Sequence, residues 1–226
     1  MSARVRSVAL VIWLFGCGSD EPGSSAGNET EVLVVERADQ LATLPSVVEQ
    51  DLELRGTALG PELVLEKLES ITGILRVRDT EGLVRLSLPA LVSAGLGVAV
   101  VNNHDLAEVE LPVLSSVGQF TVDRNRMLPS IAAPQLLRAN SVAIVANPAL
   151  TGVSLPLLDL EPEAEWPWSP EVVLRDNLML ESFELPAVQR ITSLRVSGNT
   201  LLRTLRLPAL RELSDISLTQ DLLTEL

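Results

Sequence analysis

The chain has 226 residues, with 30 acidic and 17 basic side chains and a formal net charge of −13. A molecule this acidic is poorly suited to binding nucleic acid or an anionic lipid surface as its main partner. Tyrosine is absent and cysteine occurs once, so the chain cannot form an internal disulfide and its core must consist of aliphatic side chains.

The first residues predict export and a lipid anchor. Arg4 and Arg6 precede a short apolar stretch at residues 8–15, which is too short to cross a bilayer as a helix of roughly 20 residues. The stretch runs into the sequence LFGC, which ends at Cys17. This sequence resembles the lipobox of bacterial lipoproteins, in which the cysteine is lipidated and becomes the mature N-terminus. We therefore expect a lipoprotein signal peptide at residues 1–16 and lipidation at Cys17.

Residues 17–30 follow as a stretch rich in glycine, serine and acidic side chains, which is typical of a flexible tether. By the same resemblance, Gly18 indicates delivery to the outer membrane, facing either its periplasmic or its outer side. The alternative is an ordinary cleaved signal with an incidental cysteine. Without Arg4 and Arg6, 15 basic and 30 acidic side chains remain, and the net charge is about −15.

Residues 31–226 repeat with a period of about 22 residues. A leucine–proline pair or its equivalent recurs with gaps of 23, 22, 22, 30 and 22 residues, starting at Leu88, Leu111, Ala133, Leu155, Leu185 and Leu207. A fixed period of this length indicates stacked units, each of which buries its apolar face only against its neighbours.

Each unit contains an alternating apolar pattern that predicts a short strand with one buried face. The expected buried pairs are Leu52/Leu54, Leu75/Val77, Val98/Val100, Phe120/Val122, Val142/Ile144, Val172/Leu174, Leu194/Val196 and Ile216/Leu218. A polar residue follows five positions after the first member of each pair, at Thr57, Thr80, Asn103, Asn125, Asn147, Asn177, Asn199 and Asp221. We expect this polar column to cap backbone groups where the chain leaves each strand.

The pattern L-x-V-x-x-N-x-x-L-x-x-V-x-L-P-x-L-x-x-V resembles the receptor L-domain, a leucine-rich-repeat-like unit of growth-factor receptor ectodomains, and is closer still to bacterial lipoproteins that carry such units. The resemblance implies a mainly β fold, a right-handed parallel β-helix or leucine-rich-repeat-like solenoid of about eight 22-residue turns. It also implies a short N-terminal helix around residues 38–44. The chain lacks the cysteines of the receptors.

The strand residues that alternate with the buried ones define a candidate binding face. In the middle turns this face is expected to be a smooth apolar strip that includes Val101 and Val145. Four arginines border the strip, at Arg76, Arg78, Arg175 and Arg195. An apolar patch with a polar rim is typical of a contact surface, and we expect it to bind a protein or a glycan. Alternatively, valine and alanine stand here only because they favour strands.

The unit of 30 residues carries an insertion with Trp166 and Trp168 among prolines and acids. Insertions in repeat proteins often lie on the binding face, and tryptophan is a frequent anchor of interfaces and stacks on sugar rings. We therefore add both tryptophans to the candidate ligand-binding residues. The alternative is that they cover the flank of the solenoid.

No catalytic residue, metal site or cofactor is predicted. The single histidine, His104, stands in a turn and is expected to be solvated. Non-catalytic recognition or envelope structure at a membrane is therefore the expected function, through an unidentified protein or glycan and without nucleic acid. Two alternatives stay open. One is a carbohydrate-active β-helix enzyme with paired carboxylates such as Glu108 and Glu110. The other is self-association through the last turn, after Asp221, where the sequence shows no obvious cap.

Overall fold

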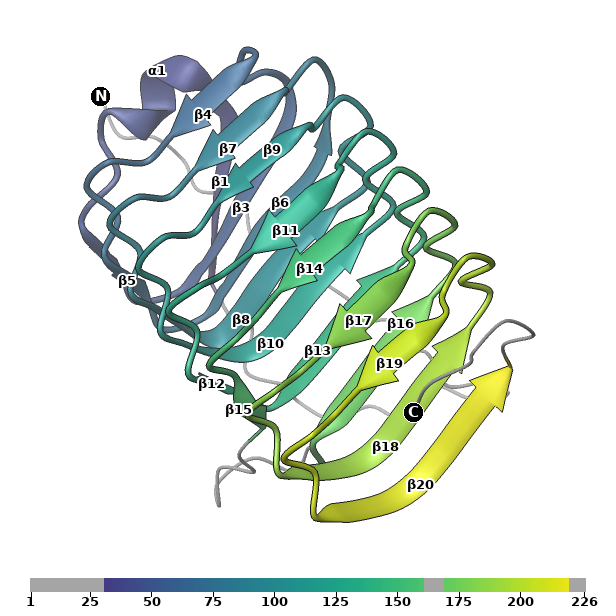
Figure 1. The fold of residues 1–226 in the computed structure, drawn as a ribbon. Coiled ribbons are helices and arrows are strands. Elements are labelled where there is room, and N and C mark those ends of the chain that lie inside the picture. The colour runs from purple at the N-terminus through teal and green to yellow at the C-terminus, as the bar shows by residue number, and fades with distance from the viewer. Residues whose placement is uncertain (1–30, 161–168, 220–226) are drawn as a thin grey trace, which may run out of the picture.

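The computed structural model describes residues 31–160 and 169–219, which form a parallel β-solenoid of about eight turns of about 22 residues each. The predicted fold class is confirmed. Figure 1 shows the turns stacked in chain order, from α1 and β1 at one end to β20 at the other. Cys17, Trp166, Trp168 and Asp221 lie outside the described residues.

The main sheet contains one long strand from each turn, and every pair of neighbours in it is parallel. In order across the sheet, its long strands are β1 (Val32–Arg37), β3 (Asp51–Ala58), β6 (Ile74–Thr80), β8 (Ser93–Val101), β10 (Ser116–Asp123), β13 (Ser141–Val145), β16 (Glu171–Arg175), β18 (Arg190–Ser197) and β20 (Glu212–Thr219). Four two-residue strands extend it at the corner: β2 (Val47–Val48), β5 (Ser70–Ile71), β12 (Arg138–Ala139) and β15 (Asp159–Leu160).

A second wall of short strands faces the main sheet across the core (Figure 1). It consists of a five-stranded sheet with β4 (Glu62–Val64), β7 (Arg85–Ser87), β9 (Glu108–Glu110), β11 (Ser130–Ala132) and β14 (Gly152–Ser154). A two-stranded sheet continues it with β17 (Ser182–Glu184) and β19 (Thr204–Arg206). Because each turn from β3 to β18 contributes a strand to both walls, the aliphatic side chains between the walls form one continuous core.

The register places equivalent residues of successive repeats on top of one another. Phe120 lies between Val98 and Val142, and all three are 1% exposed. Every predicted buried pair from Leu52/Leu54 to Leu194/Val196 lies in this core, as expected. The last pair differs, because β20 is the edge strand of the main sheet in the described residues and Ile216 is 43% exposed there.

The predicted N-terminal helix is present but short. α1 spans Ala38–Leu41, and the two backbone N–H groups of Glu36 and Arg37 both donate to Oε1 of Gln40 at 2.9 Å. This side chain supplies the acceptor that the open N-terminal turn lacks. Leu41 and Leu44 are half-buried against the core, so the helix covers the first turn of the solenoid.

The polar column forms a buried asparagine ladder, made of Asn103, Asn125, Asn147, Asn177 and Asn199, each at most 1% exposed. In each consecutive pair, the backbone N–H and the side-chain Nδ2 of the earlier asparagine donate to Oδ1 of the next, at 3.0–3.3 Å. Thr80 begins the series by donating its hydroxyl to Asn103 Oδ1 at 2.7 Å.

The prediction for Thr57 is wrong, since this residue is exposed and outside the column. The register shifts between Arg55 and Gly56, and Gly56 pairs with Thr80 in its place. Gly56 adopts a φ of 98°, a backbone conformation that glycine adopts readily, so the bulge displaces the threonine outward.

Candidate ligand-binding face

The outer face of the main sheet contains a hollow of about 410 Å³, which we call the outer hollow. It extends over five adjacent strands, β10, β13, β16, β18 and β20. Its lining includes Thr121, Asp123, Ser141, Ala143, Val145, Glu171, Val173, Arg175, Arg195, Ser197, Ser217 and Thr219. These side chains are brought together because outward-facing positions in register form columns that run across the sheet.

The structure divides the predicted site residues into two groups. Val145, Arg175 and Arg195 line the outer hollow, whereas Arg76, Arg78 and Val101 lie on the same face of the sheet but are not part of its lining. Val101 and Val145 are both half-buried rather than fully exposed. The smooth apolar strip expected from the sequence is interrupted between these two valines, because Asp123 pairs with both of them.

Arg76 and Arg78 are held by buried carboxylates. Arg76 Nη1 lies 2.7 Å from Oδ2 of Asp51, and Arg78 Nη2 lies 2.9 Å from Oε1 of Glu53. The two acids are only 5% and 3% exposed, although Glu53 alternates with the buried Leu52 and Leu54 and so belongs to the outer face of its strand. Because removing either arginine would leave a buried carboxylate with one partner fewer, these arginines have a structural role that does not require a ligand.

The two arginines of the outer hollow also have acidic neighbours. Arg195 Nη1 lies 3.0 Å from Oε1 of Glu171, within the hollow itself. Arg175 Nε lies 3.4 Å from Oδ2 of Asp176, which is at the edge of the turn. The hollow is therefore close to electrically balanced, on a molecule that is strongly acidic overall.

Asp123 is the residue of this face that the sequence analysis missed. It is 8% exposed, and its Oδ1 atom has no hydrogen-bond partner among the described residues. Its other oxygen, Oδ2, lies 3.1 Å from Nη2 of Arg124. Burial raises the pKa of the Asp123 carboxyl, and the charges of Arg124 and Arg175 only partly oppose this effect. The available sequence signal was an acid in a register column that carries Val101 and Val145 on either side.

Glu108 and Glu110, the carboxylates named for the enzymatic alternative, both belong to β9 in the five-stranded sheet. Glu110 Oε2 accepts a hydrogen bond from the Ser87 hydroxyl at 2.6 Å and one from Arg85 Nη2 at 2.9 Å. The Ser87 hydrogen bond, together with Arg85, lowers the pKa of Glu110. A general acid of a glycosidase needs the opposite shift, so this pair does not favour that alternative.

A second pair of acids, Asp123 and Glu171, lies in the outer hollow itself. Glu171 shares a register column with Gln119, which is four residues before Asp123 in β10. Two strand spacings and four residues of strand separate the two backbone positions by roughly 16 Å. Paired carboxylates that cleave glycosidic bonds stand about 5–10 Å apart, so the backbone spacing does not favour this pair either.

The remaining chemistry of the described residues is limited. His104 is exposed at its turn, as expected. Among residues 31–160 and 169–219, no group of three or more histidine, cysteine or acidic side chains is placed to hold a metal ion. Within the same ranges, no helix has the length and apolar character needed to cross a membrane.

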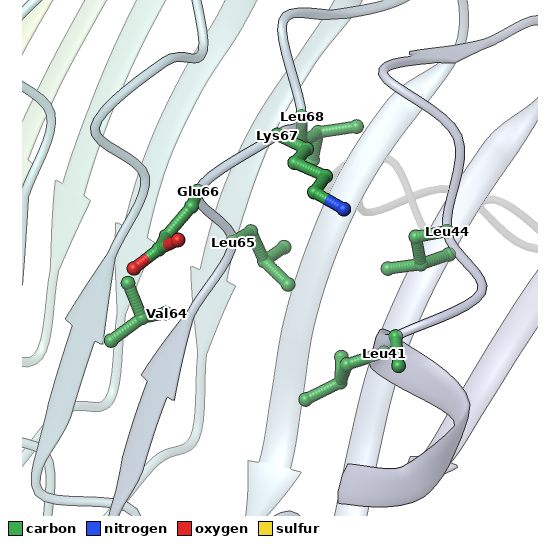
Figure 2. A pocket seen from close by; sticks show the side chains of 8 residues that line it. Leu41, Leu44, Val64, Leu65, Glu66, Lys67 and Leu68 are labelled. Atoms are coloured by element: carbon green, nitrogen blue, oxygen red, sulfur yellow. The ribbon is translucent and has the colours of Figure 1, made fainter.

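A smaller hollow of about 210 Å³ lies at the N-terminal end, beside α1. Figure 2 shows Leu41 and Leu44 on one side of it and Leu65 and Leu68 on the other, with the Lys67 side chain extending into the gap. Leu65 and Leu68 are core residues, at 5% and 2% exposure. This hollow is therefore the seam between the covering helix and the first turn of the solenoid.

Comparison of the chain with protein-family models, with curated proteins and with solved structures gives no match. Arguments about function therefore rest on the geometry of the solenoid and its outer face.

Proposed function

We propose that this protein is a non-catalytic recognition protein of the bacterial cell envelope, held at the outer membrane by a lipid on Cys17. A signal peptide at residues 1–16 and a tether at residues 17–30 would present a receptor L-domain-like solenoid at the membrane surface. In this proposal the outer hollow takes up a protein or a glycan, and the insertion with Trp166 and Trp168 contributes to the contact.

The observation that carries the proposal is the outer hollow itself. Five consecutive turns contribute side chains to one continuous depression, in which Val145 and its apolar neighbours lie between polar and charged side chains. An apolar centre with a polar surround is the usual composition of a recognition surface. Solenoids bind through such extended faces, because every turn adds a row of side chains at a fixed spacing.

A matched pair of substitutions tests the proposal. Val145→Glu places a charge in the outer hollow, while Val101→Glu places the same charge on the same face, two strands away and outside the hollow lining. In crosslinking pull-downs from native envelopes, we expect Val145→Glu to abolish capture and Val101→Glu to preserve it. Equal capture by both variants, with intact circular dichroism spectra, would remove this face from consideration.

A second candidate function, self-association, is favoured by an observation on β20. Leu213 and Ile216 of this strand are 37% and 43% exposed, whereas their register partners Ile191 and Leu194 in β18 are at most 1% exposed. Together with Leu205 and Leu210, they line an apolar hollow of about 420 Å³. An edge strand with exposed core-type side chains is a template for pairing with another chain.

Sedimentation measurements distinguish this candidate. The full chain with Cys17→Ser should then show a mass that rises with concentration, and Ile216→Glu should abolish the rise. The control is Val64→Glu, which charges a valine that is 40% exposed in β4 of the second wall. A monomer mass for the parent chain at all concentrations would exclude self-association through β20.

A further inference from the structure

The outer hollow contains an acceptor that nothing in the described protein satisfies. Asp123 is buried, with 8% of the residue exposed, lines the hollow, and has an Oδ1 atom without a hydrogen-bond partner among the described residues. A buried polar group without a partner destabilises the fold, because it has lost its hydrogen bonds to water and gained none. The two neighbouring repeats avoid this cost by carrying valine at the same register position. An acid at this one position is therefore a feature that the solenoid itself does not require.

The charges of the hollow point to the class of ligand. Arg195 is paired with Glu171, and Asp123 with Arg124. A charged ligand would have to compete with these pairs for a partner, whereas a neutral one leaves them intact. β10, β13, β16 and β18 each have a parallel strand on both sides, so among the described strands of the hollow only β20, at its border, has an edge to which a peptide could pair. Over the rest of the hollow only side chains contact the ligand.

Those side chains are rich in hydroxyl groups. Thr121, Ser141, Ser197, Ser217 and Thr219 line the hollow around a small aliphatic area formed by Ala143, Val145 and Val173. Hydroxyl side chains both donate and accept hydrogen bonds, which matches the hydroxyl groups of a sugar. The aliphatic area matches the C–H face of a sugar ring, which is apolar.

Building on the proposed recognition function, we infer that the outer hollow binds a neutral glycan, with Asp123 accepting a hydrogen bond from one of its hydroxyl groups. Oδ1 is itself shielded from solvent, so binding requires Asp123 to turn about χ2, which is a soft torsion. Arg124 lies at the other oxygen, and its charge partly opposes the rise in the pKa of the Asp123 carboxyl that burial causes. Hydrogen bonds to a charged acceptor are stronger than those between neutral groups, so this contact contributes a large part of the affinity.

Asp123→Val tests the inference, because it makes this position identical to Val101 and Val145. The probe is a panel of uncharged hexose and N-acetylhexosamine oligomers, with the matching uronic-acid oligomers as the charged comparison. Binding to the full chain carrying Cys17→Ser is measured by titration calorimetry. We expect the parent to bind at least one uncharged oligomer, and Asp123→Val to weaken that binding by roughly tenfold or more. Glu184→Val, which removes an outward acid from β17 in the second wall, should leave the affinity unchanged.

Stability provides the second readout and shows whether the variant folds. The folded-state pKa of Asp123 is raised above its ordinary value of 3.8, so its charge destabilises the fold at neutral pH. Asp123→Val should therefore unfold at a higher urea concentration than the parent at pH 7. This advantage should shrink as the pH falls through the folded pKa and then below 3.8, where the parent's carboxyl is neutral in both states.

Three results would overturn the inference. If no uncharged oligomer binds while Val145→Glu still abolishes capture of an envelope protein, the glycan assignment fails and the recognition function stands. If an uncharged oligomer binds equally to the parent and to a folded Asp123→Val, Asp123 is not the acceptor. If no oligomer binds and Val145→Glu has no effect on capture, the recognition function fails as well.

Discussion

At the scale of single residues, the asparagine ladder is the feature of the fold that depends most on the identity of individual side chains. Asn147 shows why, since its Nδ2 donates to the carbonyl oxygens of Val122 and Val145 at 3.0 and 2.9 Å. Its Oδ1 accepts the backbone N–H of Asn125 at 3.0 Å. One side chain thus satisfies backbone groups from two turns, at a place where the chain leaves the strand and water is excluded.

Removing that side chain should be costly. Asn147→Ala removes three hydrogen bonds to backbone groups; the Val145 carbonyl still accepts from the Arg124 N–H at 3.0 Å, whereas the Asn125 N–H and the Val122 carbonyl lose the Asn147 side chain, and each buried group left unpaired costs about 1–3 kcal/mol. We expect the free energy of unfolding to fall by about 3–5 kcal/mol, measured by urea denaturation. Thr200→Ala is the control, because its hydroxyl makes a similar bond between turns, to the Leu178 carbonyl, but at the surface. A loss below about 1 kcal/mol for Asn147→Ala would mean that water replaces the ladder.

The residue before each ladder position has a backbone in the left-handed region, and this conformation costs free energy for a residue other than glycine. Ala146 has a φ of 54°, and the same region is occupied before each of the other ladder asparagines. For an alanine this conformation costs roughly 1–2 kcal/mol, more than the entropy that glycine loses on folding. Ala146→Gly should therefore raise the free energy of unfolding by about 0.5–1 kcal/mol. Ala143→Gly, in the strand of the same turn, should lower it by a similar amount, and if both variants change stability in the same direction the strain argument fails.

At the scale of the elements, the long repeat is accommodated without a break in the stack. Asn147 and Asn177 are 30 residues apart, yet their ladder bond of 3.1 Å is close in length to the 3.0 Å bonds on either side of it, which join turns of 22 residues. β13 and β16 pair in register from Ser141↔Glu171 to Val145↔Arg175. The additional residues therefore lie between β15 and β16 in the sequence. The core of this turn resembles the cores of the neighbouring turns.

A deletion tests whether the stack of turns is independent of these additional residues. Removing residues 161–168 joins Leu160 to Ser169 and leaves three peptide steps from Leu160 to Glu171. The chain uses the same number of steps from Ala94 to Gly97, at the equivalent corner of β8. We expect the deleted chain to fold with a free energy of unfolding within about 1 kcal/mol of the parent, since changing loop length has a small entropic effect. Circular dichroism is the appropriate measurement, because the deletion removes both Trp166 and Trp168. A loss of several kcal/mol would show that the segment is structural.

The repeat period made most of these elements predictable. Alternation gave the buried pairs from Leu52 to Val196, and the polar column gave the ladder from Thr80 to Asn199. The register shift at Gly56 could not be found in this way, because it leaves Asp79 of β6 without a partner in β3 while the spacing of the apolar residues stays the same. The burial of Glu53 was missed for a related reason. Alternation assigns a face to a side chain but does not show which neighbours cover it, and here Arg55 and Arg78 do.

The face that carries the candidate site could be predicted from the sequence, but the hollow in that face could not. Val145, Arg175 and Arg195 come together because the register aligns them, and register follows from the period. The pairing of Arg76 with Asp51, 25 residues apart, depends on where a long arginine side chain meets a carboxylate of the neighbouring turn, and no repeat position encodes that contact. Asp123 was visible as an acid between two valines of its register column, but only the structure adds that one of its oxygens has no hydrogen-bond partner among the described residues.

At the scale of the whole molecule, the proposed anchor and the fold have to act together. The α1 end of the solenoid is the end at which residues 17–30 join it, so a lipid on Cys17 would fix that end closest to the membrane. The strands of the outer hollow belong to the later turns, farther along the stack from that end. A rigid stack of turns, each about 4.8 Å from the next, would then hold the recognition face away from the lipid surface. Such spacing suits an acidic protein near anionic headgroups, because it reduces electrostatic repulsion.

Substitution at Cys17 tests the anchor on which this arrangement depends. In the native host, the parent chain should incorporate an alkyne-labelled fatty acid and sediment with the outer membrane, whereas Cys17→Ser should do neither, because no other cysteine is available. Gly18→Asp separates lipidation from sorting: by resemblance to bacterial sorting signals, it should keep the label and leave the outer-membrane fraction. An unlabelled parent chain that is still membrane-bound would show that another segment holds it. An unlabelled parent in the soluble fraction would favour the ordinary cleaved signal. The outer hollow would then belong to a soluble protein rather than to one held at a membrane surface.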